Sequence, residues 1–392
     1  MAVKKHLVSR WGFIISLFDV QVCFIPYYII ECDMEKLPER IRIKDIARLA
    51  GVSVGTVDRV LHGRAGVSPK SRESVEAVLQ QLDYQPNMYA SALATNKKYL
   101  FAYILPKHDE GSYWCDIEKG LDYAVRTYND FHISIAPFYY DPYIPETFEE
   151  CSKGVVDLSP DGVVLSPSTP EKTFSLTKEL KRKGIPFVFV DSNMPDLEPL
   201  AFYGQRSVQS GYFAGSMLML LARDEQEVVI FRHIHAKNEA KIMNQQRSRE
   251  VGFKTYMTKY YSNCKILELD IDVELSPNQV DNLLDNFFIQ HPNVKYGLTF
   301  NSKVGIFGEY IERRKRTDFH LLGYDLLDKN VQCLKNGSVH FLIAQQPFTQ
   351  GFCSIDGLCK HLIFRKEIKQ LNYMPIELLT ADNIDYYVDK QE

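Results

Sequence analysis

The chain has 392 residues and a formal net charge of −4, with 45% hydrophobic and 24% charged residues. This length accommodates two to three domains with sizeable cores. The overall charge gives no signature of nucleic-acid binding, so the distribution of charge along the chain matters more.

The eight cysteines lie far apart, with no CxxC or Cys/His metal spacing. They are typical of reduced cytoplasmic thiols rather than of a disulfide framework or a zinc site. His233 and His235 follow an apolar run but have no third ligand nearby. We therefore expect no metal and no cofactor.

Residues 11–30, WGFIISLFDVQVCFIPYYII, form an apolar run of about membrane-spanning length after three basic residues. Asp19 near its middle and Pro26 interrupt the run. The positive-inside rule would place everything after such a span outside the membrane. The interpretation of this segment therefore depends on the kind of domain that comes after it in the chain.

The pattern from residue 39 to 84 predicts three short helices. Gly51 allows a tight turn between the first two helices, and Ser53 is a good N-cap for the second. Ser68 and Pro69 announce the third as an N-cap followed by proline at the first helical position. The apolar faces comprise Ile46, Leu49, Ala50, Val52, Val57, Val60 and Leu61, then Val75, Val78, Leu79 and Leu82. Packed together they make a helix-turn-helix unit, whose second helix enters the DNA major groove.

The charge of this region agrees with a DNA-binding head. From Glu39 to Lys98 there are ten Lys/Arg against six Asp/Glu, a local net charge of +4 in an otherwise acidic chain. An ordinary solvated helical surface would explain the charges, and three helices of an unrelated α domain would explain the apolar faces. Neither alternative explains the order of the motifs.

That order, IKDIARLAGVS, TVDRVLHG, VSPKSRESV and LDYQPN, closely resembles the LacI (lactose-repressor) family of bacterial transcription regulators. The resemblance implies DNA contacts from a set of residues in the head: Lys44, Ser53, Val54, Gly55, Thr56, Asp58, Arg59 and His62. Arg59 is the strongest candidate, because a bidentate arginine–guanine pair carries specificity. Asp58 stands where the family usually has serine, so it accepts from a cytosine amine or orients Arg59. Gly55 has no side chain with which to read a base.

Residues 85–98 resemble the hinge of that family, with a similar PN–A–L pattern. The resemblance implies that Asn87, Ala90 and Leu93 contact DNA. Leu93 would act as an apolar wedge between base steps in the minor groove. Ser91 departs from the long polar or basic residue common there, which puts phosphate contacts in doubt. A plain interdomain linker is the alternative.

From residue 99 onward, apolar runs alternate with helical patterns. Ten strands are predicted, at 100–106, 132–139, 162–167, 185–191, 200–204, 227–232, 265–271, 296–300, 320–325 and 341–345. Most are uniformly apolar, as parallel strands with helical crossovers are. Ten strands are too many for one sheet with one core, so we expect an α/β body of two doubly wound parallel-sheet lobes. Lobe 1 would take about 99–207 and 346–371, and lobe 2 about 208–345 and 372–392.

This body resembles the periplasmic sugar-binding-protein fold (type I) that the LacI family uses as its sensor. Carboxylates, amides and aromatic rings at strand ends suit a polyol ligand. The resemblance implies an effector site made of Tyr113, Trp114, Ser166, Asp191, Arg249, Asn301, Asp325 and Gln345. For any one of them, a strand-terminal polar residue that caps a helix is the alternative. Ser166 and Ser192 replace an asparagine and an arginine of ribose binders, so the sugar is not identified.

We therefore interpret the chain as a cytoplasmic, homodimeric LacI-type regulator, a repressor of carbohydrate genes that binds a palindromic operator and is switched by a sugar-like effector. A catalytic role is not expected, because GxSxG, P-loop and GxGxxG motifs are missing from the sequence.

The alternative is an exported sugar-binding protein of a transporter, with residues 1–30 as its signal, but such a receptor has no use for a DNA-binding head. A head in the cytoplasm favours translation from Met34. Within an N-terminal extension of residues 1–38, residues 1–33 would then result from a wrongly placed start codon.

Overall fold

The computed structural model describes residues 42–61, 63–82, 84, 97–222, 227–235 and 244–388. The predicted N-terminal extension, Met34, His62 and most of the predicted hinge, including Asn87, Ala90 and Leu93, lie outside these residues. The chain divides into two compact units, Met1–Pro86 and Asn87–Glu392.

The first unit consists of three helices, α1 (Ile43–Ala50), α2 (Val54–Leu61) and α3 (Pro69–Gln81). Gly51 ends α1 with a φ of 64°, in the left-handed region where glycine is favoured. The Ser53 hydroxyl accepts from the backbone N–H of Thr56 at 3.1 Å at the start of α2. Ser68 caps α3 by accepting from the N–H of Ser71, with Pro69 at the first helical position. The three predicted helices and their caps are confirmed.

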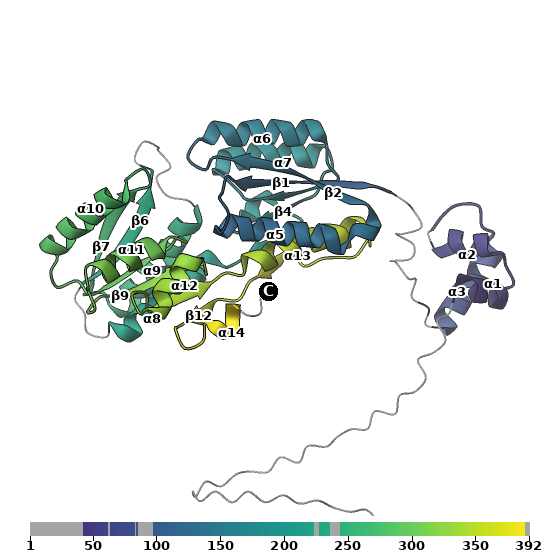
Figure 1. The fold of residues 1–392 in the computed structure, drawn as a ribbon. Helices are drawn as coiled ribbons and strands as arrows, with labels where there is room; N and C mark the ends of the chain where they lie inside the picture. Colours follow the sequence, from purple (N-terminus) through teal and green to yellow (C-terminus); the bar gives the residue numbers. More distant parts are fainter. Residues whose placement is uncertain are drawn as a thin grey trace, which may run out of the picture. The chain divides into compact units, whose positions relative to one another are not determined.

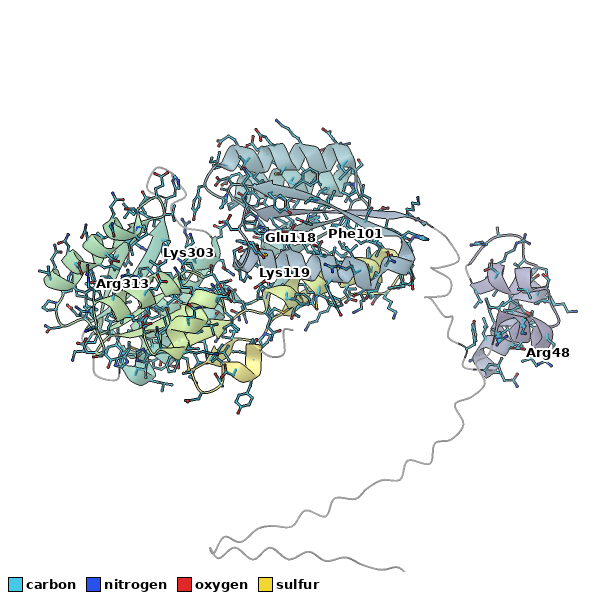
Figure 2. All side chains as sticks on the ribbon, viewed as in Figure 1. Arg48, Phe101, Glu118, Lys119, Lys303 and Arg313 are labelled. Carbon is cyan, nitrogen blue, oxygen red and sulfur yellow. The ribbon has the colours of Figure 1, made fainter. Side chains whose placement is uncertain are left out.

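The core of this unit is small and aliphatic. Ile46, Val57 and Val75 are fully buried, one from each helix. Leu49 was predicted to lie on the apolar face but is 55% exposed, which corrects that assignment. Helix α1 is only two turns long, and its buried face consists of Ile46, Ala47 and Ala50, so Leu49 lies off that face. Arg48, also on α1, is exposed and is labelled in Figure 2.

Lobe 1 of the second unit is a six-stranded parallel sheet in the order β11-β5-β4-β3-β1-β2. Helices α5 and α13 cover one face of it, and α6 and α7 cover the other (Figure 1). The strands are β1 (Tyr99–Pro106), β2 (Ile133–Tyr140), β3 (Gly162–Leu165), β4 (Phe187–Val190), β5 (Ala201–Gly204) and β11 (Leu371–Tyr373). The helices are α5 (Tyr113–Thr127), α6 (Pro145–Leu158), α7 (Pro170–Arg182) and α13 (Pro347–Leu362), with short 3₁₀ turns at Asn129–Phe131 and Pro195–Leu197. Phe101 of β1 is fully buried inside this lobe (Figure 2).

Lobe 2 repeats the arrangement with a sheet in the order β12-β10-β9-β8-β6-β7. Its strands are β6 (Glu227–Ile234), β7 (Lys265–Asp272), β8 (Tyr296–Thr299), β9 (His320–Tyr324), β10 (Phe341–Ala344) and β12 (Glu377–Leu379). Its helices are α8 (Ser207–Leu221), α9 (Asn244–Tyr260), α10 (Pro277–Gln290), α11 (Val304–Arg313), α12 (Asp328–Lys335) and α14 (Asp385–Val388). One hydrophobic cluster lies on the α8–α9 side of the sheet, and a larger one on the side of α10, α11 and α12.

All ten predicted strands are present, and the predicted class of two doubly wound lobes is confirmed. Two short strands, β11 and β12, were not predicted. Each extends one sheet at the edge beyond β5 or β10, and β12 is antiparallel to β10. Three residues give too short a pattern to be recognised in the sequence.

The chain passes between the lobes three times, after β5, after β10 and after β11. The amide Nε2 of Gln205, directly after β5, donates to the carbonyls of Ala344 and Pro375, each at 2.7 Å. One buried side chain thus ties all three connections together. In the described part of the chain, none of the helices has the length and apolar character needed to span a membrane.

Candidate functional site

Two buried aspartates lie at equivalent places in the two lobes. Asp191 follows β4 and Asp325 follows β9, and these strands hold the same position in their sheets. Both residues have a positive φ, 66° and 69°, a conformation that aspartate tolerates better than most side chains. Repeated topology therefore places one carboxylate from each lobe at the carboxyl ends of the sheets, where ligands bind in such folds.

A single arginine lies among these carboxylates. Arg249 of α9 is fully buried, and its guanidinium lies 4.0 Å above the ring of Tyr324. Its Nη1 donates to the carbonyl of Phe300 at 2.8 Å, and its Nη2 donates to the Oε1 of Gln345. The Nε atom has no hydrogen-bond partner among the described residues. A buried donor without a partner is costly, so this atom is available to a ligand.

Side chains from lobe 1 and from the β10–α13 connection complete the network. The Tyr113 hydroxyl donates to Asp191 Oδ1 at 2.8 Å, and the Gln345 amide donates to Asp325 Oδ1 at 2.7 Å. Gln350 of α13 accepts from the backbone N–H of Asp191 and donates to the Tyr113 hydroxyl. The structure thus joins five predicted effector residues, Tyr113, Asp191, Arg249, Asp325 and Gln345, in one network.

The electrostatics of the network are dominated by burial. Removal from water raises the pKa of Asp325 to about 7, and Arg249 opposes the rise only in part. Burial also raises the pKa of Asp191 and of Tyr113 above their ordinary values. The raised pKa values of both carboxyls indicate that this site disfavours negative charge.

Three predicted residues lie outside this network. Ser166 is buried and lines a small cavity of about 60 Å³ beside Asp191. Trp114 packs against the core of lobe 1 and touches the ring of Tyr113 edge-on. Asn301 lies beside the cleft with its Nδ2 2.6 Å from Nδ1 of His233, and it accepts from the backbone N–H of Lys303.

Several residues of the cleft were not predicted. They are Gln205, Asn244, Gln245 and Gln350, all of which make hydrogen bonds in or beside the network. Gln205 follows β5 as Gln345 follows β10, so the strand-end rule could have found it. The other three are in the first turns of helices α9 and α13, and no strand-end pattern marks them.

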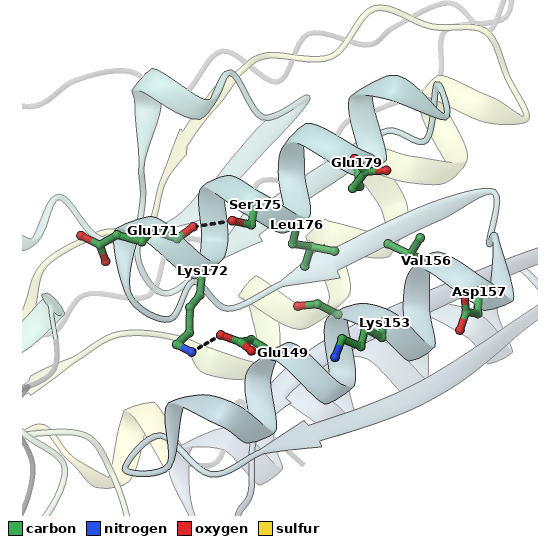
Figure 3. Close-up of a pocket in the computed structure, with 10 residues that line it drawn as sticks. Glu149, Lys153, Val156, Asp157, Glu171, Lys172, Ser175, Leu176 and Glu179 are labelled. Carbon is green, nitrogen blue, oxygen red and sulfur yellow. Dashed lines mark hydrogen bonds and ion pairs between the residues drawn. The ribbon is translucent and has the colours of Figure 1, made fainter.

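A further hollow lies away from this cleft. A groove of about 630 Å³ runs between α6 and α7 on the outer side of lobe 1, and Figure 3 shows its lining residues. Lys172 and Glu149 pair across it, and Leu176 and Val156 contribute apolar surface. Most of its charged lining residues are exposed, so we regard it as a furrow between adjacent helices rather than the ligand site.

The first unit displays most of its predicted DNA contacts on one helix and its N-cap. Ser53, Val54, Gly55 and Arg59 are exposed, and Thr56 and Asp58 are half-buried. Lys44 is exposed on α1. Asp58 accepts a hydrogen bond from Arg64 Nη1 at 3.1 Å, a partner that was not predicted.

Two family models match the chain. The model of bacterial regulatory proteins of the lacI family matches residues 42–87, and that of a periplasmic binding protein domain matches residues 101–366. A crystal structure of a protein from Bacteroides fragilis, assigned to the LacI transcriptional regulators, is 54% identical over 74% of this chain and 100% of its own, with a TM-score of 0.71. The chain belongs to the LacI family of bacterial regulatory proteins, with a periplasmic binding protein domain as its body.

More distant matches agree on the fold. GanP, a glucose-galactose binding protein from Geobacillus stearothermophilus, is 17% identical over 74% of this chain and 99% of its own, with a TM-score of 0.63. Catabolite control protein A of Streptococcus mutans is 37% identical over 98 residues, which is 25% of this chain. The chain spans only 29% of the length of that relative.

Proposed function

We propose that this protein is a sequence-specific DNA-binding transcription regulator whose operator binding is switched by a sugar-like effector in the cleft between its lobes. One observation carries the proposal: a helix-turn-helix unit with an exposed second helix is joined in one chain to a body with a buried polar network between two lobes. Exposed side chains on such a helix suit base edges in the major groove. Neither part has a catalytic role in this proposal.

The head binds as one of two copies. Arg59 reads a guanine, and Lys44, Ser53, Val54, Gly55 and Thr56 line the same groove. The bond from Arg64 to Asp58 leaves Asp58 less available for a base and makes it a residue that orders the end of α2. His62, Asn87, Ala90 and Leu93 complete the contacts, with 85–98 as the hinge. We propose that the protein is a homodimer in the cytoplasm. Its operator is palindromic, because two identical heads require two related half-sites.

The cleft binds an uncharged, hydroxyl-bearing effector. Asp191, Asp325 and Gln345 accept from and donate to hydroxyls, and the free Nε of Arg249 adds a donor. A sugar phosphate would bring negative charge next to two buried carboxyls whose raised pKa values show that the site disfavours it. We therefore propose a neutral sugar, with Ser166, Trp114 and Asn301 around it.

Effector and operator are coupled through the arrangement of the lobes. We propose that lobe 1 spans about 99–207 and 346–371 and lobe 2 the rest of the body. Residues of both lobes bind the effector, so it favours one arrangement of the lobes over another. The hinge segments then order on DNA in one arrangement only.

Arg59→Ala tests the DNA-binding role. We expect it to weaken binding to the operator by about 1–3 kcal/mol and to relax the preference at one base pair of each half-site. The measurement is a gel-shift titration with the operator, its single-base variants and scrambled DNA. Arg48→Ala, which removes an exposed arginine from α1, is the control and should leave base preference unchanged. An equal loss on operator and scrambled DNA for Arg59→Ala would contradict the assignment.

A further inference from the structure

One side chain of lobe 2 reaches across the cleft to lobe 1. Gln245 lies in the first turn of α9, and its Nε2 donates to Oδ1 of Asp191. The same nitrogen donates to Oε1 of Gln345 at 3.0 Å. Both hydrogens of the amide are therefore used within the network. The adjacent Asn244 donates to the carbonyl of Ser168 in lobe 1 at 3.1 Å, so the start of α9 is bonded to lobe 1 at two points.

These contacts are of the kind that a ligand would make. A sugar hydroxyl pair donates to carboxylate and amide oxygens, as the Gln245 amide does here. Without Gln245, Asp191 would keep only the Tyr113 and Ser192 hydroxyls and its share of Arg249. Gln245 thus supplies the buried Asp191 carboxyl with a hydrogen-bond donor that it would otherwise lack.

The cavities beside the two aspartates are small, and a more spacious hollow of about 480 Å³ borders Gln245 next to Ser192 and Gln205. The cavity bordered by Asp191 and Gln245 measures about 60 Å³, and the one bordered by Asp325 and Gln345 about 10 Å³. Small-molecule sites measure roughly 300 Å³ or more. A ligand could take over the contacts with Asp191 and Gln345 only if the lobes part or the Gln245 side chain leaves its position.

We propose that Gln245 is a built-in occupant of the cleft, which holds the two lobes together in the absence of effector and is displaced when effector binds. The inference rests on the proposed effector cleft and not on what the head binds. It makes Gln245 a residue that sets effector affinity, because every effector must compete with it. It also makes the closed arrangement of the lobes accessible without effector.

Hydrogen exchange followed by mass spectrometry tests this with the full-length chain, without effector or DNA. In Gln245→Ala we expect roughly tenfold faster exchange in peptides covering residues 188–193 and 244–250, because two hydrogen bonds, one of them to a carboxylate, are lost. Gln245→Glu should exchange faster still at pH 8, because a second carboxylate would face Asp191. Gln209→Ala is the matched control, since Gln209 lies in the first turn of α8 with an exposed side chain.

Unchanged exchange at the cleft in both Gln245 variants would overturn the proposal. A rise spread evenly over core strands β3 and β8 would also overturn it, because loss of a contact between lobes should open the cleft and leave each sheet intact. Operator binding is measured separately. If the Gln245 variants show no opening while Arg59→Ala loses base preference, the built-in occupant fails and the proposed regulator stands.

Discussion

At the scale of single residues, the cleft depends on two carboxyls and one guanidinium held out of water. Asp191 and Asp325 each occupy a left-handed backbone position after a strand, and burial raises the pKa of both while the buried Arg249 guanidinium lowers it. Burial favours the neutral form of a carboxyl, and the nearby cation favours the charged form. Burial wins for both aspartates, so their protonation is linked to the stability of the fold.

Asp325→Asn tests this linkage through the pH dependence of stability. The raised pKa means that the folded state holds the proton of Asp325 more tightly than the unfolded chain, whose carboxyls titrate near 4. The free energy of unfolding of the wild type should therefore fall as pH rises from about 4 to about 7, by up to about 4 kcal/mol from this group. The variant lacks this loss, and asparagine fits the positive φ. Urea denaturation at pH 5 and pH 8 measures the free energy of unfolding of both proteins. Relative to the wild type, the variant should be more stable at pH 8 than at pH 5.

Asp318→Asn, an exposed position in lobe 2, is the control for a change of net charge alone. A stability difference between wild type and Asp325→Asn that is the same at both pH values would contradict the assigned burial.

The sequence predicted those residues of the cleft that match ligand positions of the resembling fold, most of them at strand ends. Asp191, Asp325 and Gln345 were predicted because they follow apolar runs at positions that match ligand-binding residues of the resembling fold. Gln245 was not, because the first turn of a helix has no such signal and its role depends on how α9 meets lobe 1. The hydrogen bonds of Asp58 and Asn301 likewise depend on packing that a linear pattern does not contain.

At the scale of elements, α9 is held in place by very close packing on α8. The two helices run side by side, and Gly252 of α9 faces the backbone of Val208 and Tyr212. A Cβ added at Gly252 would lie 1.9 Å from the carbonyl oxygen of Val208. Since α9 carries Gln245 and Arg249, this contact fixes the position of both in the cleft.

Gly252→Ala should therefore destabilise the body by about 3 kcal/mol, because backbone atoms have to move apart to admit one methyl group. Urea denaturation measures the loss. Val251→Ala removes an exposed side chain from the same helix and is the control, with a change within about 0.5 kcal/mol. Equal stability of Gly252→Ala and wild type would show that the two helices are farther apart than this contact requires.

Elements were predictable where the pattern was long. Most of the ten main strands are apolar runs of four to eight residues, and the three short helices of the first unit carry recognisable caps. The edge strands β11 and β12 consist of LNY and ELL, which are too short and too mixed to be read. Their pairing comes from the third passage between the lobes, which is a property of the tertiary fold.

At the scale of the whole molecule, one chain joins a helix-turn-helix unit of the lacI type to a periplasmic binding protein domain. The family models match the two parts separately, at residues 42–87 and 101–366. Linkage between two sites requires that each ligand prefer one arrangement of the molecule. An effector held by residues of both lobes would meet that condition, and the bonds of Gln245 set the strength with which it must compete.

The proposed switch is tested most directly by a DNase footprint of the full-length protein on the DNA upstream of its own gene, titrated with neutral sugars and with their phosphates. We predict a protected palindrome whose occupancy changes with at least one neutral sugar and with none of the phosphates. A footprint without two related half-sites, or one that responds to a sugar phosphate and to none of the neutral sugars, would contradict the proposed regulator.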